Sequence, residues 1–105
     1  MKITLTHAVV LAGLFGTGNA AMADMQLAKQ RGCTGCHALD KKSVGPAFKD
    51  VAAKYAGDAT AQTKLVEKVK NGGKGVWGQA AMPANSPRVP AADIEKLVSF
   101  ILSIK

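Results

Sequence analysis

The sequence predicts an all-α fold of about four short helices. Apolar residues recur at the spacing of a single helix face in several segments, and Gly and Pro residues separate these segments. No segment shows the regular alternation of apolar and polar residues that is typical of a half-buried strand. One long stretch rich in Gly and Pro lies before the last helical segment, and we expect it to form a loop.

Residues 1–23 have the pattern of a secretory signal peptide. A basic Met1-Lys2 precedes a mostly apolar stretch, and Ala21-Met22-Ala23 provides the small residues of a cleavage site before Asp24. The apolar stretch is shorter than the roughly 20 residues of a membrane span, so a retained anchor is the less favoured alternative. We therefore expect export to the periplasm and a mature domain, residues 24–105, without stable membrane insertion.

The mature domain is small, and domains of this size often need a disulfide, a metal or another cofactor for stability. The whole chain of 105 residues carries a formal net charge of +7. Its basic residues are spread out and few aromatic residues accompany them, which argues against nucleic-acid binding and favours an acidic protein partner. A merely solvated surface explains the same residues, and we expect a monomer. The candidate docking charges are Lys41, Lys42, Lys49, Lys74 and Arg88.

Two helices are expected in the first half of this domain. Asp24 is a favourable N-cap for a helix over about Met25 to Arg31, which Gly32 ends. Gly45-Pro46 opens the second helix, and Gly57 ends it. The apolar face of this second helix consists of Phe48, Val51, Ala52 and Tyr55.

Two further helices flank the long loop. One helix runs from about Thr60 to Lys70 and ends at Asn71-Gly72-Gly73, whereas residues 74–89 have no helical period. A loop of that length in so small a domain is usually functional. The last helix begins at Pro90, a favourable first helical position. Its apolar stripe consists of Ile94, Leu97, Val98, Ile101 and Leu102.

Cys33-Thr34-Gly35-Cys36-His37 has the spacing that attaches c-type haem. Two thiols at this spacing reach the two vinyl groups of one porphyrin, and His37 then lies under the iron as an imidazole ligand. A disulfide between the two cysteines would close too short a loop to stabilise much. A thioredoxin-like pair lacks its βαβ context, and a zinc site lacks a fourth ligand once His7 leaves with the signal peptide.

Met82 is the candidate for the second axial ligand. The mature domain retains only Met25 and Met82, and Met25 lies too close to the attachment motif to reach the opposite haem face. Met82 lies in the predicted loop and precedes Pro83, although a methionine in apolar surroundings is usually a packing residue. His/Met ligation raises the reduction potential and leaves no open position on the iron. These ligands indicate electron transfer rather than oxygen or peroxide chemistry.

Two alternatives stay open on the residues alone. If Met82 does not ligate, an open iron position would suit a ligand-binding or peroxidase-like haem protein. If no haem is attached, the domain would be a redox or binding module of another kind.

Further short segments accompany the attachment motif. They are Leu27-Ala28-Lys29, Val44-Gly45-Pro46-Ala47, Asp50-Val51-Ala52-Ala53-Lys54-Tyr55, Lys70-Asn71-Gly72, Gly75-Val76-Trp77-Gly78, and Met82-Pro83 with Asn85. Together they make residues 24–105 resemble the small bacterial class I cytochromes c of the c-551/c-552 (c8) group. The resemblance implies a class I cytochrome c fold around one haem c, bound covalently through Cys33 and Cys36, and an electron-transfer protein rather than an enzyme.

The resemblance also implies roles for residues around the two ligands His37 and Met82. The Pro46 carbonyl would accept the ring N–H of His37 and orient the ring, although Pro46 also suits a helix start. Trp77 would donate its indole N–H to a haem propionate, or simply pack in the core. Asn85 would donate toward the Met82 sulfur, or simply form a turn.

Members of this group are periplasmic electron carriers of respiratory chains. The resemblance therefore implies redox partner proteins, with a cytochrome reductase on one side and a nitrite reductase or terminal oxidase on the other. One departure is Ala28, where the group often has an aromatic residue in the first helix. We expect Phe100 of the last helix to lie at the contact with the first helix near Gly32.

The predicted cleavage site is tested by expressing the full chain in a bacterium that exports proteins and attaches haem. The purified protein should begin at Asp24, because Ala23 is the small residue that the peptidase requires. Intact mass and N-terminal sequencing measure this directly, and Ala23→Leu should leave the precursor uncleaved. A wild-type protein that keeps residues 18–23 would contradict the site.

Overall fold

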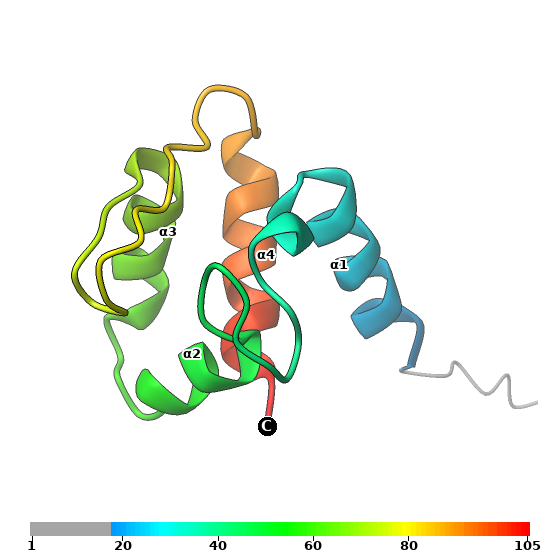
Figure 1. The fold of residues 1–105 in the computed structure, drawn as a ribbon. Helices are drawn as coiled ribbons and strands as arrows, with labels where there is room; N and C mark the ends of the chain where they lie inside the picture. The colour runs from blue at the N-terminus through cyan, green and yellow to red at the C-terminus, as the bar shows by residue number, and fades with distance from the viewer. Residues whose placement is uncertain (1–17) are drawn as a thin grey trace, which may run out of the picture.

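The structure, a computed structural model, describes residues 18–105, and residues 1–17 of the predicted signal peptide lie outside that part. Its elements in chain order are α1 (Gly18–Gln30), the 3-10 helix η1 (Cys33–Gly35), α2 (Phe48–Lys54), α3 (Ala61–Asn71) and α4 (Ala91–Ser103) (Figure 1). These four α-helices confirm the all-α class. No helix within residues 18–105 is long and apolar enough to span a membrane.

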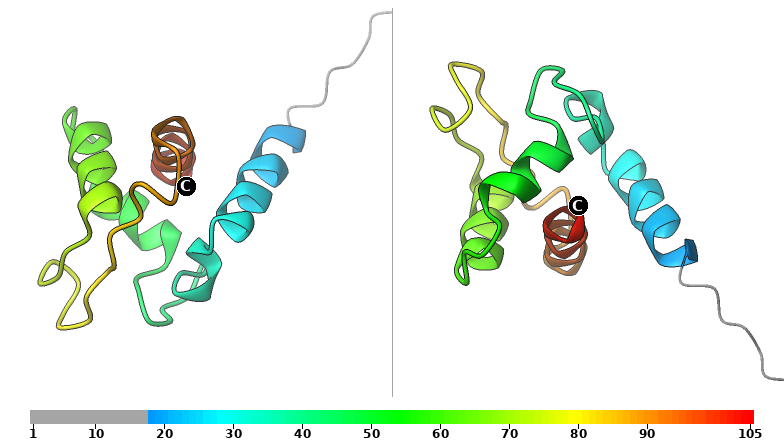
Figure 2. Two further views of the ribbon diagram at one scale, coloured as in Figure 1. Left: turned by 90° about the horizontal axis from the view of Figure 1, so that it is seen from above. Right: turned by 90° about the horizontal axis from the view of Figure 1, so that it is seen from below.

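Helix α4 is the central element, because α1, α2 and α3 all contact it. The two further views show α4 nearly end-on, with α3 on one side and α1 on the other (Figure 2). Three residues of the apolar stripe predicted for this helix are buried, with Ile94, Leu97 and Val98 each at most 3% exposed. The other two, Ile101 and Leu102, are half-buried. The amphipathic period of this segment therefore predicted its packing face correctly.

Two clusters of buried residues hold the helices together. One cluster joins α3 and α4 to the end of the long loop, and it consists of Val66, Val89, Ile94 and Val98. The other joins α1, α2 and α4, and it consists of Ala28, Phe48 and Leu97. Each cluster thus lies on one side of α4, and α4 separates the two halves of the core.

Helix α1 is longer than the sequence predicts. It begins at Gly18 rather than after an Asp24 N-cap, so Asp24 lies inside the helix. The preceding residues Ala20, Ala21 and Ala23 explain the difference, because alanine is the strongest helix former and extends the helix toward the N-terminus of the uncleaved chain. The predicted end is correct, since Gly32 follows with a left-handed φ of 82°.

Helix α2 begins at Phe48, later than the predicted start at Gly45-Pro46. The backbone at these two residues is engaged elsewhere: the Gly45 N–H donates to the Cys36 carbonyl at 2.7 Å, and the Pro46 carbonyl lies near the His37 ring. The chain must complete this turn before a helix can start. Pro46 is therefore not the first helical residue.

The contact between α1 and α4 differs in one side chain from the expectation. Phe100 is buried, but the cluster that joins the two helices contains Ala28 and Leu97 instead. Ala28 is fully buried. Its small side chain packs against the larger side chains of Phe48 in α2 and Leu97 in α4.

Ile94 provides the sharpest test of this packing, because it is fully buried in the cluster between α3 and α4. Ile94→Ala should lower the free energy of unfolding by about 2–5 kcal/mol, since it removes buried methyl groups and leaves a cavity. Urea unfolding of the mature protein measures this. Lys96→Ala, an exposed change two residues further along α4, is the control and should have little effect. Equal effects of the two substitutions would contradict the assigned core.

Candidate functional site

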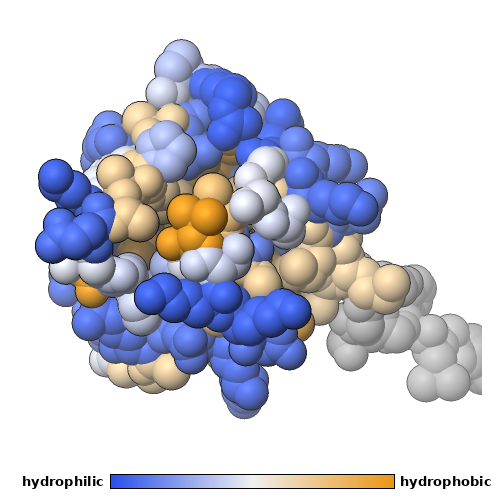
Figure 3. Space-filling model, in the orientation of Figure 1, coloured by the Kyte–Doolittle hydropathy of each residue, from blue (hydrophilic) through white to orange (hydrophobic). Residues whose placement is uncertain are grey.

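An apolar cavity opens between the attachment motif and the long loop. Its lining comes from η1, the segment before α2, and parts of α2, α3, α4 and the loop. Seen in the orientation of Figure 1, apolar side chains gather near the middle of this face and hydrophilic side chains surround them (Figure 3). Cys33, Cys36, His37 and Met82 all line this one cavity. The fold thus brings together residues that are far apart in the sequence.

The two cysteines lie at the edge of the cavity as free, half-buried thiols. Cys33 starts η1 directly after the left-handed Gly32, and Cys36 ends this 3-10 turn. Burial raises the pKa of the Cys33 thiol above its usual value, although the positive charge of Arg88 partly offsets this. Both thiols are thus placed beside the same apolar cavity, as attachment to a single planar porphyrin requires.

His37 is held in one orientation by its neighbours. Its Nδ1 lies 2.8 Å from the Pro46 carbonyl oxygen, so this nitrogen carries the proton and donates it. The Phe48 ring stacks against the imidazole, with centroids 5.4 Å apart and planes 21° apart. The other nitrogen, Nε2, keeps its lone pair for a metal ion. The periodicity of the sequence had placed Phe48 only on the apolar face of a helix and gave no signal for this contact.

Met82 is positioned by its backbone. It pairs with Gly73, just after α3, through two hydrogen bonds of 2.8 and 3.0 Å. Gly72 makes this pairing possible, because its φ is +73° and a Cβ atom there would collide with the Met82 carbonyl oxygen. The start and the end of the loop are thus tied together beside α3, with Met82 lining the cavity.

Asn85 is buried, and its contacts differ from those that the resemblance implied. Its side-chain N–H groups donate to the carbonyl oxygens of Val69 and Pro83, each at 3.2 Å, rather than to the Met82 sulfur. Its side-chain oxygen accepts a hydrogen bond of 2.7 Å from Arg88. In the structure, Asn85 therefore joins the loop to the end of α3.

Two basic residues accompany the cavity without having been predicted there. Lys68 of α3 lines it. Lys54 lies over the ring of Trp77, with its Nζ 5.6 Å from the ring centroid. Trp77 itself lines the cavity and is 40% exposed. Sequence periodicity could not reveal these contacts, because they depend on how the loop folds over α2 and α3.

The candidate docking charges fall into two groups. Four of them are exposed, namely Lys41, Lys42, Lys49 and Lys74. Arg88 is also exposed, but its guanidinium group donates hydrogen bonds within the chain. Of the five candidate docking charges, the four lysines therefore remain candidates for contact with another protein.

Comparison with known proteins identifies the family of this chain. The model of the Cytochrome c family matches residues 24–105. The chain is 58% identical to cytochrome c-551 of Allochromatium vinosum over 81% of this chain and 89% of that protein, and 47% identical to cytochrome c-552 of Hydrogenobacter thermophilus over 91% and 96%. The crystal structure of Nitrosomonas europaea cytochrome c552 superposes with a TM-score of 0.74 and 48% identity, over 77% of this chain and 99% of that one.

The apolar cavity, the paired thiols and the free Nε2 of His37 suit one planar iron porphyrin. The relatives are named as cytochromes, which transfer electrons and are not enzymes. The protein therefore belongs to the cytochrome c family, as a small class I member that carries one haem c attached through Cys33 and Cys36.

Proposed function

We propose that this protein is a periplasmic one-electron carrier in which His37 and Met82 are the axial ligands of the haem iron. Haem supplies an iron atom that alternates between the ferrous and ferric states. The observation that carries the proposal is that His37 and Met82 line the same apolar cavity as the two attachment cysteines. A nitrogen and a thioether sulfur at that iron would leave it no open position for oxygen or peroxide.

The residues around His37 support its role as a ligand. The Pro46 carbonyl holds the Nδ1 proton and thereby makes the other ring nitrogen more basic. Gly45 passes close beside the ring, since a Cβ atom built there would lie 2.5 Å from His37 Cε1. Backbone on one edge and Phe48 on one face therefore leave the imidazole little freedom to rotate.

The polar residues of the cavity suit the propionate groups of haem. The indole N–H of Trp77 is a hydrogen-bond donor without acceptor capacity, and Lys68 brings a positive charge to the same cavity. A hydrogen-bond donor and a positive charge are the groups that stabilise an anionic carboxylate. We therefore assign Trp77 and Lys68 as propionate partners, with Lys54 supporting the Trp77 ring from outside.

Docking of redox partners follows from the surface charge. The exposed lysines 41, 42, 49 and 74 belong to a chain of net charge +7, and they would attract an acidic protein surface and speed its association. Val44 and Trp77, 60% and 40% exposed, line the cavity and add apolar contact area beside it. The partners that we propose are a cytochrome reductase as donor and a nitrite reductase or terminal oxidase as acceptor.

Replacing the sulfur ligand tests the proposal. In the mature haem protein, Met82→Ala should abolish the weak far-red band of the oxidised state and lower the reduction potential, because the thioether that favours ferrous iron is lost. It should also allow carbon monoxide to bind the reduced protein rapidly. Absorption spectra, redox titration and carbon monoxide mixing measure the three effects.

Met25→Ala is the matched control, because Met25 packs beside the cluster between α1 and α4 and not in the cavity. It should keep the far-red band and the potential. An unchanged spectrum and potential in Met82→Ala would show that another group, or none, completes the coordination of the iron.

Gly45→Ala tests the position of His37. Its added methyl group would force the imidazole or the turn to move, at a cost of about 1–3 kcal/mol in the free energy of unfolding. Denaturant unfolding of the haem protein measures this cost. Gly35→Ala is the control, because a Cβ atom there meets no protein atom within 4 Å. The close approach would be disproved if both variants were as stable as the wild type.

A further inference from the structure

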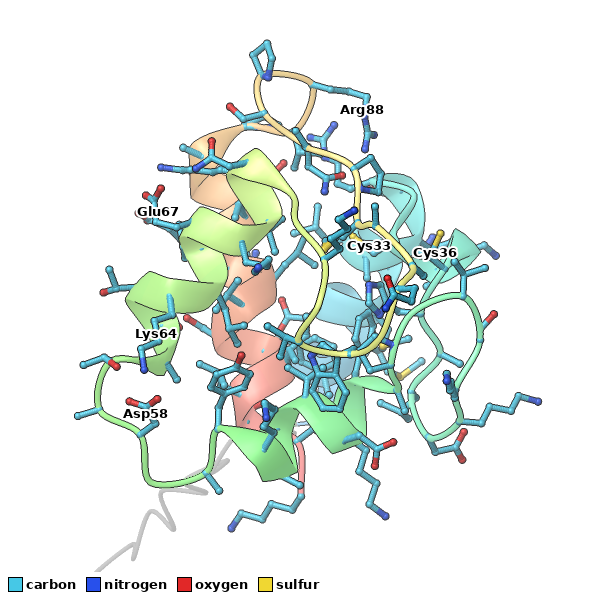
Figure 4. All side chains as sticks on the ribbon, turned by 60° about the vertical axis from the view of Figure 1, so that its left-hand side comes forward. Cys33, Cys36, Asp58, Lys64, Glu67 and Arg88 are labelled. Carbon is cyan, nitrogen blue, oxygen red and sulfur yellow. The ribbon has the colours of Figure 1, made fainter. Side chains whose placement is uncertain are left out.

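Arg88 connects two parts of the chain that lie far apart in the sequence. Its Nη1 donates to the carbonyl oxygen of Arg31 at 3.1 Å, and its Nη2 donates to Oδ1 of Asn85 at 2.7 Å. We call these two hydrogen bonds the Arg88 bridge. Figure 4 shows Arg88 near the top of the molecule and Cys33 below it, nearer the middle.

One end of the Arg88 bridge lies at the haem-attachment segment. The Arg31 carbonyl accepts the bond two residues before Cys33, at the point where α1 has just ended. This point is itself fixed, because the Arg31 guanidinium donates two hydrogen bonds, of 3.0 and 2.7 Å, to Oδ2 of Asp93 in the first turn of α4. The bridge therefore ends at a segment that is itself joined to α4.

The other end lies on the loop that carries Met82. Asn85 is 9% exposed, and both its side-chain nitrogen and its backbone N–H donate to the carbonyl of Val69. Its own carbonyl accepts the Val89 N–H at 2.7 Å. The side-chain oxygen Oδ1 of Asn85 accepts its hydrogen bond from Arg88. Loss of the Arg88 side chain would therefore leave this buried oxygen without its partner.

The geometry points to Arg88 as a positioning residue for Met82: it holds the Met82 loop against the segment that bears the attachment cysteines, and so slows the replacement of Met82 by other ligands. The part of this inference that concerns ligand replacement rests on the proposed His37/Met82 ligation. Arg88 does not line the cavity, so we expect its effect to pass through Asn85 and Pro83, whose carbonyl accepts from the Asn85 side chain.

A hydrogen bond from a charged donor stabilises more than an exposed ion pair does. Arg88 and Asn85 lie on the same loop, so movement of the loop away from the attachment segment breaks the other bond of the bridge, the one to the Arg31 carbonyl. A surface pair such as Lys64 and Asp58 is indifferent to that motion. Without Arg88 the loop should therefore open roughly tenfold more often. Folding as a whole should change much less, because the core clusters around α4 contain none of these residues.

The experiment measures loop opening directly in Arg88→Ala, using the mature haem protein in its reduced state. Amide hydrogen exchange by NMR follows the N–H groups of Met82 and Asn85, which donate to Gly73 and Val69. Both should exchange roughly tenfold faster than in the wild type, whereas the Val98 amide inside α4 should change little. Arg88→Lys, which keeps the charge but offers no fork of donors, should give an intermediate rate.

A second measurement follows the rate at which Met82 leaves the iron. Imidazole is mixed with the oxidised protein at increasing concentration until the binding rate no longer rises, because the limiting rate then equals the rate at which Met82 leaves the iron. This limiting rate should increase roughly tenfold in Arg88→Ala.

Lys64→Ala is the matched control, since Lys64 makes a charged hydrogen bond of 3.0 Å to Asp58 away from the cavity. Its Met82 and Asn85 amides and its limiting imidazole rate should match the wild type. Exchange rates in Arg88→Ala that equal those of Lys64→Ala would overturn the inference.

The wild-type far-red band separates this inference from the proposed function. If the oxidised wild type lacks that band, the proposed ligation by Met82 fails and the ligand part of the inference fails with it. The amide exchange rates then still decide whether Arg88 holds the loop. If the band is present and the exchange rates do not respond to Arg88→Ala, the inference fails and the proposed function stands.

Discussion

The contact between His37 and the Pro46 carbonyl couples the attachment motif to the rest of the domain. The two atoms lie 2.8 Å apart, and the neighbouring Gly45 N–H donates to the Cys36 carbonyl. Together these bonds turn the chain back on itself, so α2 can begin only at Phe48. Phe48 then stacks on the imidazole and also packs with Ala28 and Leu97. The orientation of His37, the start of α2 and the contact between α1 and α4 all depend on this one turn.

The far side of the cavity depends on a loop that has no regular secondary structure of its own. Its backbone polar groups still need partners, and the end of α3 provides several of them. The Asn85 and Ser86 N–H groups donate to the carbonyls of Val69 and Lys70, and Met82 pairs with Gly73. The unpaired carbonyls that every helix leaves at its C-terminus are thus used to place the loop. This explains how a chain segment rich in Gly and Pro can line a defined cavity.

The basic residues of the chain divide between two tasks. Both arginines donate hydrogen bonds within the chain, Arg31 to Asp93 and Arg88 to Asn85. A guanidinium group suits this task, because its fixed fork of donors can bond two groups at once. The exposed lysines 41, 42, 49 and 74 carry strongly hydrated charges on flexible side chains, which can meet a partner without a fixed geometry. The net charge alone therefore overstates how much of the basic surface is available for docking.

The sequence by itself determined the class of fold, the attachment of haem and the apolar face of α4. These features are local: the two cysteines and His37 act through their spacing, and α4 follows from the period of its apolar residues. Only the tertiary structure decided the start of α2, the stacking of Phe48 on His37, and the contacts of Asn85, Lys68 and Arg88. Each of these features joins segments that are distant along the chain. The local pattern of apolar and polar residues therefore does not reveal which hydrogen-bond partner a backbone group finds in the fold. The position of Ala28 shows the same limit, because the volume left by a small residue is filled by side chains of two other helices.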